Sequence, residues 1–297
     1  MANRPRIAFC FSWQARTLDQ TYLFFQKNLF DAAKGQWFDY DIFCAVEDDE
    51  DVDKVNLLNP TKVEKIKSSD VEKIIEEKYW DFIKDDWNKY YLMNCDFSIF
   101  LQQIYKVSKS ISMVNNVDYK LVLRLRFDVF FFNKLNFFEI IKEINSWYII
   151  CNFPRKTKKF WIDFSKLREI EDFYFIWTEK SLLCLTSIFE NVKIFLESYK
   201  VKDRYMFILK INKIIVNTLI KINKRIWYIV SVVLACISKK FFFYWFSPES
   251  YYYEYLLLNW WKIKKTNISL ILLRKNIEDS QIQLHKKTLY EFWQFIF

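Results

Sequence analysis

One stretch of the chain decides the fold class, Tyr119-Lys120-Leu121-Val122-Leu123-Arg124-Leu125-Arg126-Phe127-Asp128. Its apolar residues and polar carboxyl end are typical of a strand that runs into a site. Alternation places Arg124, Arg126 and Asp128 on one side of this strand. Burying three charges is costly unless they form ion pairs with one another or bind a charged ligand. Two interpretations stay open, a phosphate- and cation-binding site or an internal Arg–Asp ion pair at the sheet edge.

Strands and helices are expected to alternate along the rest of the chain. Apolar runs predict strands at 6–12, 39–46, 63–66 and 147–151, and other stretches predict helices at 17–34, 69–87, 94–115 and 179–199. This order predicts an α/β fold, a mixed and mainly parallel sheet flanked by helices, in one domain over residues 1–297. A helical insertion is expected at about 200–245.

In such folds, ligands bind at the carboxyl ends of the strands. This rule brings five predicted site residues to one edge of the sheet, namely Ser12, Gln14, Arg16, Arg126 and Asp128. The acidic run 47–51 follows a strand at the same edge. It is either a solvated loop or a source of cation ligands.

Glycine is almost absent from the chain, which has one Gly (Gly35) against 12 Trp. An average protein has about 7% glycine, which supplies turns with positive φ. Several tryptophans stand where a turn favours no side chain, among them Trp13, Trp177 and the adjacent Trp260 and Trp261. We hypothesise that many of them are glycines in the organism, encoded by UGA codons that this translation reads as Trp. The alternative is a truly Trp-rich protein.

The segment Ser12-Trp13-Gln14-Ala15-Arg16-Thr17 joins the first strand to the first helix. With glycine at position 13 it is a tight turn with exposed N–H groups at a helix N-terminus, beside Arg16, which favours a phosphate. With tryptophan, that close approach is lost. The segment lacks the G-K-[ST] of a Walker A loop.

Histidine and cysteine chemistry is improbable. The chain has one His, His285, and its six Cys are isolated, without C-x-x-C spacing. We interpret the cysteines as reduced core thiols of a cytosolic protein. Asp172 precedes a predicted turn and helix, where an Asp is either a general base or acceptor-hydroxyl ligand, or a helix N-cap.

The formal charge of +9 suits an anionic partner. The basic residues are dispersed and no recognition motif is present, so nucleic acid is not expected as a partner. Residues 205–246 combine lysines at helical spacing with an apolar run, Ile226 to Ile237, which is short of the roughly 20 residues that span a bilayer. They predict either a helix on an anionic membrane surface or a buried helical insertion. The apolar run at 7–11 is too short for a signal peptide, so we expect a cytoplasmic protein. With the membrane-surface interpretation of residues 205–246, its location is the inner face of the membrane.

Together these motifs resemble those of bacterial and giant-virus sugar transferases of the GT-A, nucleotide-diphospho-sugar transferase fold. That family opens with a strand and an S-G-Q-x-R-[ST] turn, which resembles residues 12–17, and has a later Y-D-x-[VI]-[IL]-R-x-R-x-D, which resembles residues 119–128. Weaker likenesses lie at Asp172 to Trp177 (D-x-F-x-x-G), at Pro248-Glu249 with the run to 258, and at the strand that ends in Arg274. Where the family has glycine, this chain has Trp13 and Trp177.

The resemblance implies a hexosyltransferase that moves a sugar from a nucleotide-sugar donor to a glycan or lipid-linked acceptor in surface polysaccharide synthesis. It implies catalytic roles for Asp172, which would face the acceptor, and for Asp128, which would hold a divalent cation, Mn²⁺ or Mg²⁺. The donor would be bound by Ser12, Gln14, Arg16, Arg124 and Arg126. Arg126 stands where the family's metal motif has its first acid. The alternative is a non-catalytic membrane-surface or scaffold protein with a degenerate sugar-nucleotide pocket.

Overall fold

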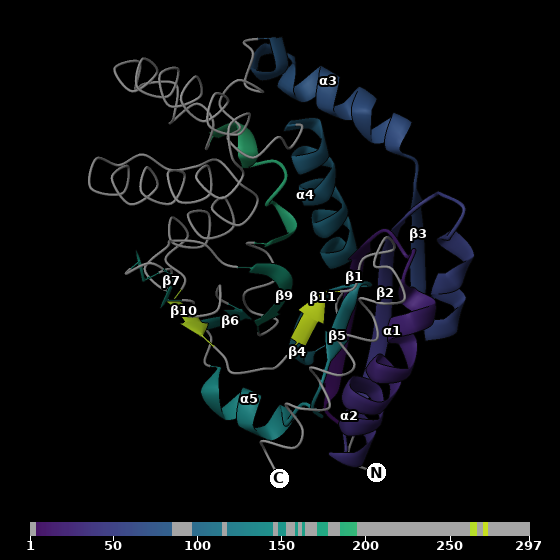
Figure 1. Cartoon of the computed structure of the whole chain (residues 1–297), viewed down its shortest axis with the longest axis vertical. Helices are drawn as coiled ribbons and strands as arrows, with labels where there is room; N and C mark the ends of the chain where they lie inside the picture. Colours follow the sequence, from purple (N-terminus) through teal and green to yellow (C-terminus); the bar gives the residue numbers. More distant parts are fainter. Residues whose placement is uncertain are drawn as a thin grey trace.

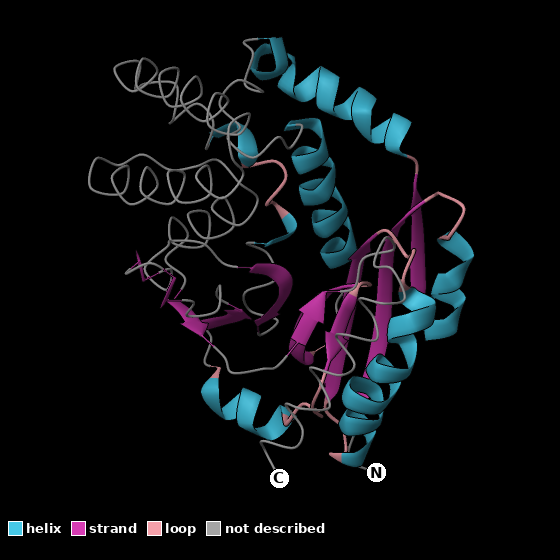
Figure 2. Cartoon of the chain, viewed as in Figure 1, coloured by secondary structure: helices cyan, strands magenta, loops and turns pink. Residues whose placement is uncertain are grey.

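The computed structural model describes residues 4–84, 97–114, 118–144, 148–152, 158–159, 162–163, 171–177, 185–194, 262–265 and 270–272. In these residues a mixed sheet is flanked by helices (Figure 1 and Figure 2), which confirms the predicted α/β class. The predicted insertion at 200–245, the 248–258 motif, Arg274 and His285 lie outside the described residues. Within the described ranges, no helix is long and apolar enough to cross a membrane.

Seven strands form the main sheet. Their order is β10 (Lys262–Lys265), β6 (Tyr148–Asn152), β9 (Glu171–Trp177), β4 (Tyr119–Arg126), β1 (Arg6–Trp13), β2 (Asp39–Glu47) and β3 (Lys62–Ile66). Neighbouring strands are parallel except at β9, which is antiparallel to β4 and to β6. The predicted mainly parallel sheet is therefore present, with one reversed strand.

Two short ladders accompany the sheet. The strand that the family resemblance places before Arg274 contains β11 (Leu270–Leu272), which pairs antiparallel with β5 (Val129–Phe131) outside the main sheet. The second ladder pairs β7 (Lys158–Lys159) antiparallel with β8 (Ile162–Asp163).

The helices match most of the predicted ranges. The range 17–34 holds α1 (Leu18–Phe25), a π-helical turn η1 (Gln26–Phe30) and α2 (Asp31–Gly35). The ranges 69–87 and 94–115 hold α3 (Ser68–Lys84) and α4 (Phe97–Ser112). A 3₁₀ segment η2 (Val52–Leu58) and α5 (Phe137–Glu143) complete the described helices. Of the helix expected at 179–199, the described residues 185–194 form short helical turns.

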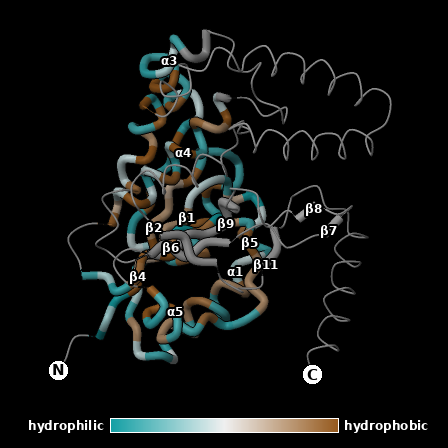
Figure 3. Tube along the Cα trace, turned by 90° about the vertical axis from the view of Figure 1, so that its left-hand side faces the viewer, coloured by the Kyte–Doolittle hydropathy of each residue, from teal (hydrophilic) through white to brown (hydrophobic). Residues whose placement is uncertain are grey.

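The two faces of the sheet are covered by different helices. Phe9 and Phe11 of β1 pack edge-to-face against Phe30 and Phe25, with ring centroids 5.2 and 5.1 Å apart, so they face α1 and η1. Alternation turns Ser12 to the opposite face, where α4 packs against β1. Hydrophobic colours gather around β1, β2 and β4 (Figure 3), as expected for strands covered on both sides.

The parallel strands β1, β2 and β4 end at one edge of the sheet. Ser12 pairs with Arg126, and Trp13 pairs with Val46, the residue before Glu47. The sequence thus correctly brings the ends of the first strand and of the 119–128 strand together. We call this edge the carboxyl edge.

The turn predicted directly after Asp172 is wrong. Residues 171–177 form β9, and Trp177 is the last residue of that strand, paired with Val122 rather than placed in a turn. The reason is that Phe173, Phe175 and their aromatic and β-branched neighbours favour a pleated, buried surface. Because β9 runs antiparallel to β4 and Tyr174 pairs with Leu125, its first residues, including Asp172, still lie at the carboxyl edge.

Candidate functional site

Arg126 and Asp128 form an ion pair where β4 ends. The Arg126 Nε atom donates to Asp128 Oδ1 over 2.9 Å, and Nη2 donates to Oδ2 over 2.8 Å. The Asp128 residue is buried, and the side chain of Arg126 is 14% exposed. Of the two interpretations left open by the sequence, the ion pair is therefore formed. Part of the Arg126 side chain nevertheless stays accessible to solvent.

Arg124 lies beneath that edge and is fully buried. Its Nε atom donates to the Ser12 Oγ atom over 3.1 Å, which ties the ends of β4 and β1 together. A buried guanidinium is costly unless polar groups or an anion compensate it. Placing one between two strand ends fixes a positive charge at the carboxyl edge.

A third cation reaches this edge from α4, and the sequence analysis missed it. Lys106 is fully buried, and its Nζ atom donates to the Glu47 Oε2 atom over 2.6 Å. The Glu47 carboxylate also accepts hydrogen bonds from Ser68 and Gln14. The sequence carried no clear signal for it, because Lys106 shares its side of α4 with two other polar residues, Gln103 and Ser110.

The Glu47 carboxyl is kept ionised by its partners. Burial raises its pKa, but the hydrogen bonds from Lys106 and Ser68 outweigh this effect, so the pKa lies below its usual range. The residues of the acidic run 47–51 therefore differ in their roles. Glu47 belongs to the site, where it binds Lys106. Asp51 instead forms an ion pair with Lys54 over 3.0 Å, and Lys54 also binds Asp19 over 3.1 Å.

Trp13 lies beside both ion pairs. Its ring centroid is 5.1 Å from the Lys106 Nζ atom and 5.9 Å from the Arg126 Cζ atom. Its backbone has a φ of 112°, in the region that favours glycine and is strained for bulky residues. The indole therefore occupies the space that the two cations border.

The remaining predicted residues are placed as follows. Ser12 and Gln14 join the cluster through Arg124 and Glu47. Arg16 follows in the loop to α1, where its carbonyl accepts a hydrogen bond from Lys54 over 3.0 Å, and its side chain is half-buried. The backbone of Asp172 lies at the same edge, on β9, and its side chain is outside the described part of the chain.

The described carboxylates do not fit a divalent cation. No group of three or more His, Cys, Asp or Glu residues in the described ranges is arranged to hold a metal ion. Both oxygens of Asp128 are bound by Arg126. Hard cations such as Mg²⁺ require several free oxygen ligands. In this arrangement the positive charge at the carboxyl edge comes from arginine and lysine.

Two described cysteines are buried, reduced thiols. They are Cys10 and Cys44, on adjacent strands β1 and β2. Burial raises the pKa of both thiols, so neither supplies a thiolate nucleophile. The prediction of core thiols is confirmed for these two.

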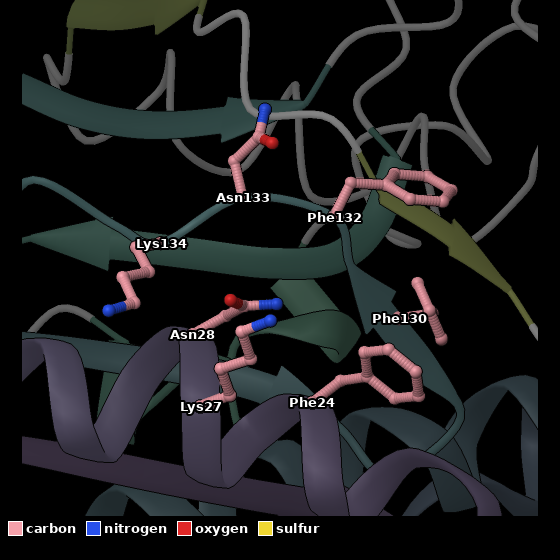
Figure 4. A pocket seen from close by; sticks show the side chains of 7 residues that line it. All are labelled: Phe24, Lys27, Asn28, Phe130, Phe132, Asn133 and Lys134. Atoms are coloured by element: carbon pink, nitrogen blue, oxygen red, sulfur yellow. The ribbon is translucent and has the colours of Figure 1, made fainter. Parts of the chain in front are cut away.

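Two surface pockets of the described chain lie away from this cluster. One, of about 260 Å³, lies between α1–η1 and the segment at β5 (Figure 4) and is lined by Phe24, Lys27, Asn28, Phe130, Phe132, Asn133 and Lys134. The other, of about 380 Å³, lies at the amino ends of β1 and β2, beside Arg6 and Asp39. Neither includes a predicted site residue.

No protein-family model and no curated protein matches the chain. Three solved structures are similar to it in outline. Mouse xyloside xylosyltransferase 1, in its apo form, is 10% identical with a TM-score of 0.35, over 69% of this chain and 77% of that one. A glycosyltransferase involved in the glycosylation of the major capsid of PBCV-1 is 8% identical with a TM-score of 0.31, over 63% and 67%. The galactosyltransferase LgtC, in complex with donor and acceptor sugar analogs, is 11% identical with a TM-score of 0.34, over 70% of each chain. We base the proposal below on the residues of the site rather than on these likenesses.

Proposed function

We propose that this chain is a glycosyltransferase that moves a sugar, a hexose, from a nucleotide-sugar donor to a glycan or lipid-linked acceptor in surface polysaccharide synthesis. The observation that carries the proposal is the cationic cluster of Arg124, Arg126 and Lys106 at the carboxyl edge. Its carboxylates, Glu47 and Asp128, leave an excess of positive charge. A diphosphate leaving group needs this kind of charge, because negative charge builds up on it as the sugar departs.

The donor's parts are assigned to different residues of the edge. Arg126 faces the diphosphate, since a guanidinium group binds two phosphate oxygens at once. Arg124 is buried beneath it, where it adds positive charge and holds Ser12. Ser12 near the end of β1 lies close to the nucleotide, as do Gln14 and Arg16, which follow the strand. Arg126 is held in place by Asp128, so removing that carboxylate misplaces the guanidinium as well as changing the charge.

The reaction requires a group that removes a proton from the acceptor. We assign this role to Asp172, which begins β9 at the carboxyl edge. The acceptor oxygen forms a bond to the anomeric carbon while the bond from that carbon to the diphosphate oxygen breaks. The diphosphate leaves with the electron pair, and the acceptor's proton passes to the Asp172 carboxylate. Arg124 and Arg126 stabilise the charge on the leaving group.

Donor binding tests the assignment of the cationic residues. We expect a nucleoside diphosphate to bind, measured by titration calorimetry, and Arg126→Ala and Asp128→Ala to weaken binding tenfold or more, because each charged hydrogen bond contributes about 1.5–3 kcal/mol. Arg4→Ala, an exposed arginine at the opposite end of β1, is the control and should leave binding unchanged. If all variants bound the nucleoside diphosphate with equal affinity, the donor site would not lie at the carboxyl edge.

The same titration tests the divalent cation, Mn²⁺ or Mg²⁺, expected from the sequence. Since Asp128 is occupied by Arg126, we expect binding of the nucleoside diphosphate to persist in EDTA. Binding that requires Mn²⁺ would show that Asp128 exchanges its guanidinium partner for the metal.

One observation favours the second candidate, a non-catalytic membrane-surface or scaffold protein. The indole of Trp13 fills the space between Lys106 and Arg126. Such a protein would bind anionic vesicles through residues 200–245, which lie outside the described part of the chain, and would turn over no nucleotide sugar. A vesicle-flotation assay on the chain with and without those residues distinguishes the two candidates. The membrane-surface protein should float with anionic vesicles only when the residues are present, and a cytoplasmic enzyme that binds no membrane should not float in either form.

A further inference from the structure

Trp13 has a backbone conformation that its side chain does not suit. Alternation along β1 would place residue 13 on the face of Phe9 and Phe11, toward α1. With a φ of 112°, the indole instead lies beside Lys106 of α4, on the opposite face. L-residues with side chains rarely adopt this φ, and glycine adopts it readily.

The space around the indole is built for an anion. Lys106 reaches it from α4 and Arg126 from β4, with charged atoms 5.1 and 5.9 Å from the ring centroid. Each cation is held by its own carboxylate, Glu47 or Asp128. Lys106 is fully buried, so its side chain is fixed rather than solvated. A glycine at position 13 would remove the indole from beside both cations.

From this geometry we infer that position 13 covers a diphosphate-binding subsite whose cations are Lys106 and Arg126, and that glycine at position 13 is the form that opens it. The inference rests on the proposed function for the identity of the ligand as a nucleotide diphosphate. It adds Lys106 as a binding residue and makes the side chain at position 13 the determinant of access.

The backbone N–H groups after position 13 add to the subsite. Removing the indole would let an anion approach the loop 13–16, which leads into α1, where the helix N-terminus favours negative charge. The buried hydroxyl of Thr17, at the N-cap of α1, has no hydrogen-bond partner in the described part of the chain. An anion that reached this helix N-terminus would give the hydroxyl an acceptor.

The probe is inorganic pyrophosphate, titrated into three full-length chains. These are the chain with Trp13, the Trp13→Gly variant and the Trp37→Gly variant. Trp37 is the matched control, because it also has a positive φ, of 64°, but lies 68% exposed at the end of α2. We expect Trp13→Gly to bind pyrophosphate at least tenfold tighter than the other two. Equal affinity in all three would overturn the inference.

Lys106 is tested in the Trp13→Gly background. Lys106→Gln should lower pyrophosphate affinity tenfold or more, since a charged hydrogen bond is lost, whereas Lys106→Arg should keep most of it. Circular dichroism melts confirm that both variants are folded. Unchanged pyrophosphate affinity in a folded Lys106→Gln variant would show that Lys106 does not bind the anion. The role of position 13 is tested independently, by comparing Trp13→Gly with Trp37→Gly.

The outcomes separate this inference from the proposed function. Tight pyrophosphate binding by Trp13→Gly without turnover of any nucleotide sugar would retain the subsite and reject the transferase. Turnover with equal pyrophosphate affinity in the three chains would retain the transferase and reject the subsite.

Discussion

At the scale of single residues, Trp37 shows the same misfit as Trp13 in a simpler setting. Helix α2 ends with the Phe38 N–H donating to the Ala33 carbonyl over 3.0 Å and the Trp37 N–H donating to the Lys34 carbonyl over 3.1 Å. This pair of bonds is the Schellman motif, whose left-handed position is usually glycine. Trp37 occupies that position with a φ of 64°. Its ring contacts the guanidinium of Arg4 at 4.4 Å.

Replacing Trp37 with glycine should therefore stabilise the fold. We expect Trp37→Gly to raise the free energy of unfolding by about 0.5–1 kcal/mol, because relief of the left-handed strain exceeds the lost contact with Arg4 and the added chain entropy. Trp80→Gly is the control, since Trp80 is similarly exposed but lies inside α3, where glycine should lower the free energy by roughly 0.5 kcal/mol. Urea unfolding measures both, and destabilisation by Trp37→Gly would contradict the assignment.

At the scale of elements, the Glu47–Lys106 pair joins the end of β2 to α4. Because the pKa of Glu47 is lowered on folding, its charge stabilises the fold above its ordinary value of 4.5 and ceases to do so as the pH falls through the lower folded value. We expect the stability difference between the starting chain and Glu47→Gln to be largest above about pH 5 and to shrink below 4.5. Urea unfolding at a series of pH values measures it. A difference that stays constant with pH would show that the pair does not act through this titration.

Most helices and strands could be predicted from the sequence, but the antiparallel strand β9 and the buried Lys106 could not. Parallel strands β1, β2 and β4 carry continuous apolar runs that are visible without a structure, and their polar ends predicted the carboxyl edge. β9 was missed because Asp172, followed five residues later by an expected glycine at position 177, favoured a turn. The aromatic run between them is instead a strand whose neighbours, β4 and β6, come from other parts of the chain. Lys106 was missed for a similar reason, because its partner Glu47 lies 59 residues away.

At the scale of the whole molecule, the scarcity of glycine is accompanied by tryptophans in backbone conformations that favour glycine. The single glycine, Gly35, lies in α2 with nothing within 4 Å of the place of a Cβ atom, and it has no positive φ. In the described residues, positive φ values instead fall on Trp13, Trp37 and Asn59. This pattern favours the hypothesis that UGA encodes glycine in the organism.

The gene and the native protein test that hypothesis together. We expect the codons for positions 13 and 37 to read UGA, and peptide mass spectrometry of the protein from its own cells to find glycine at both. The codon for Trp80, inside a helix, has no such backbone requirement and serves as a comparison. UGG codons at 13 and 37, with tryptophan in the native peptides, would reject the hypothesis and leave a strained, Trp-covered site.

Turnover of a nucleotide sugar tests the central claim most directly. A panel of nucleotide sugars is incubated with the Trp13→Gly chain and with the same chain carrying Arg126→Ala, and release of the nucleoside diphosphate is measured. The account expects at least one donor to be consumed by the first chain and a loss of tenfold or more in the second. Release from no donor in the panel, or equal release by both chains, would contradict a transferase site at the carboxyl edge of this sheet.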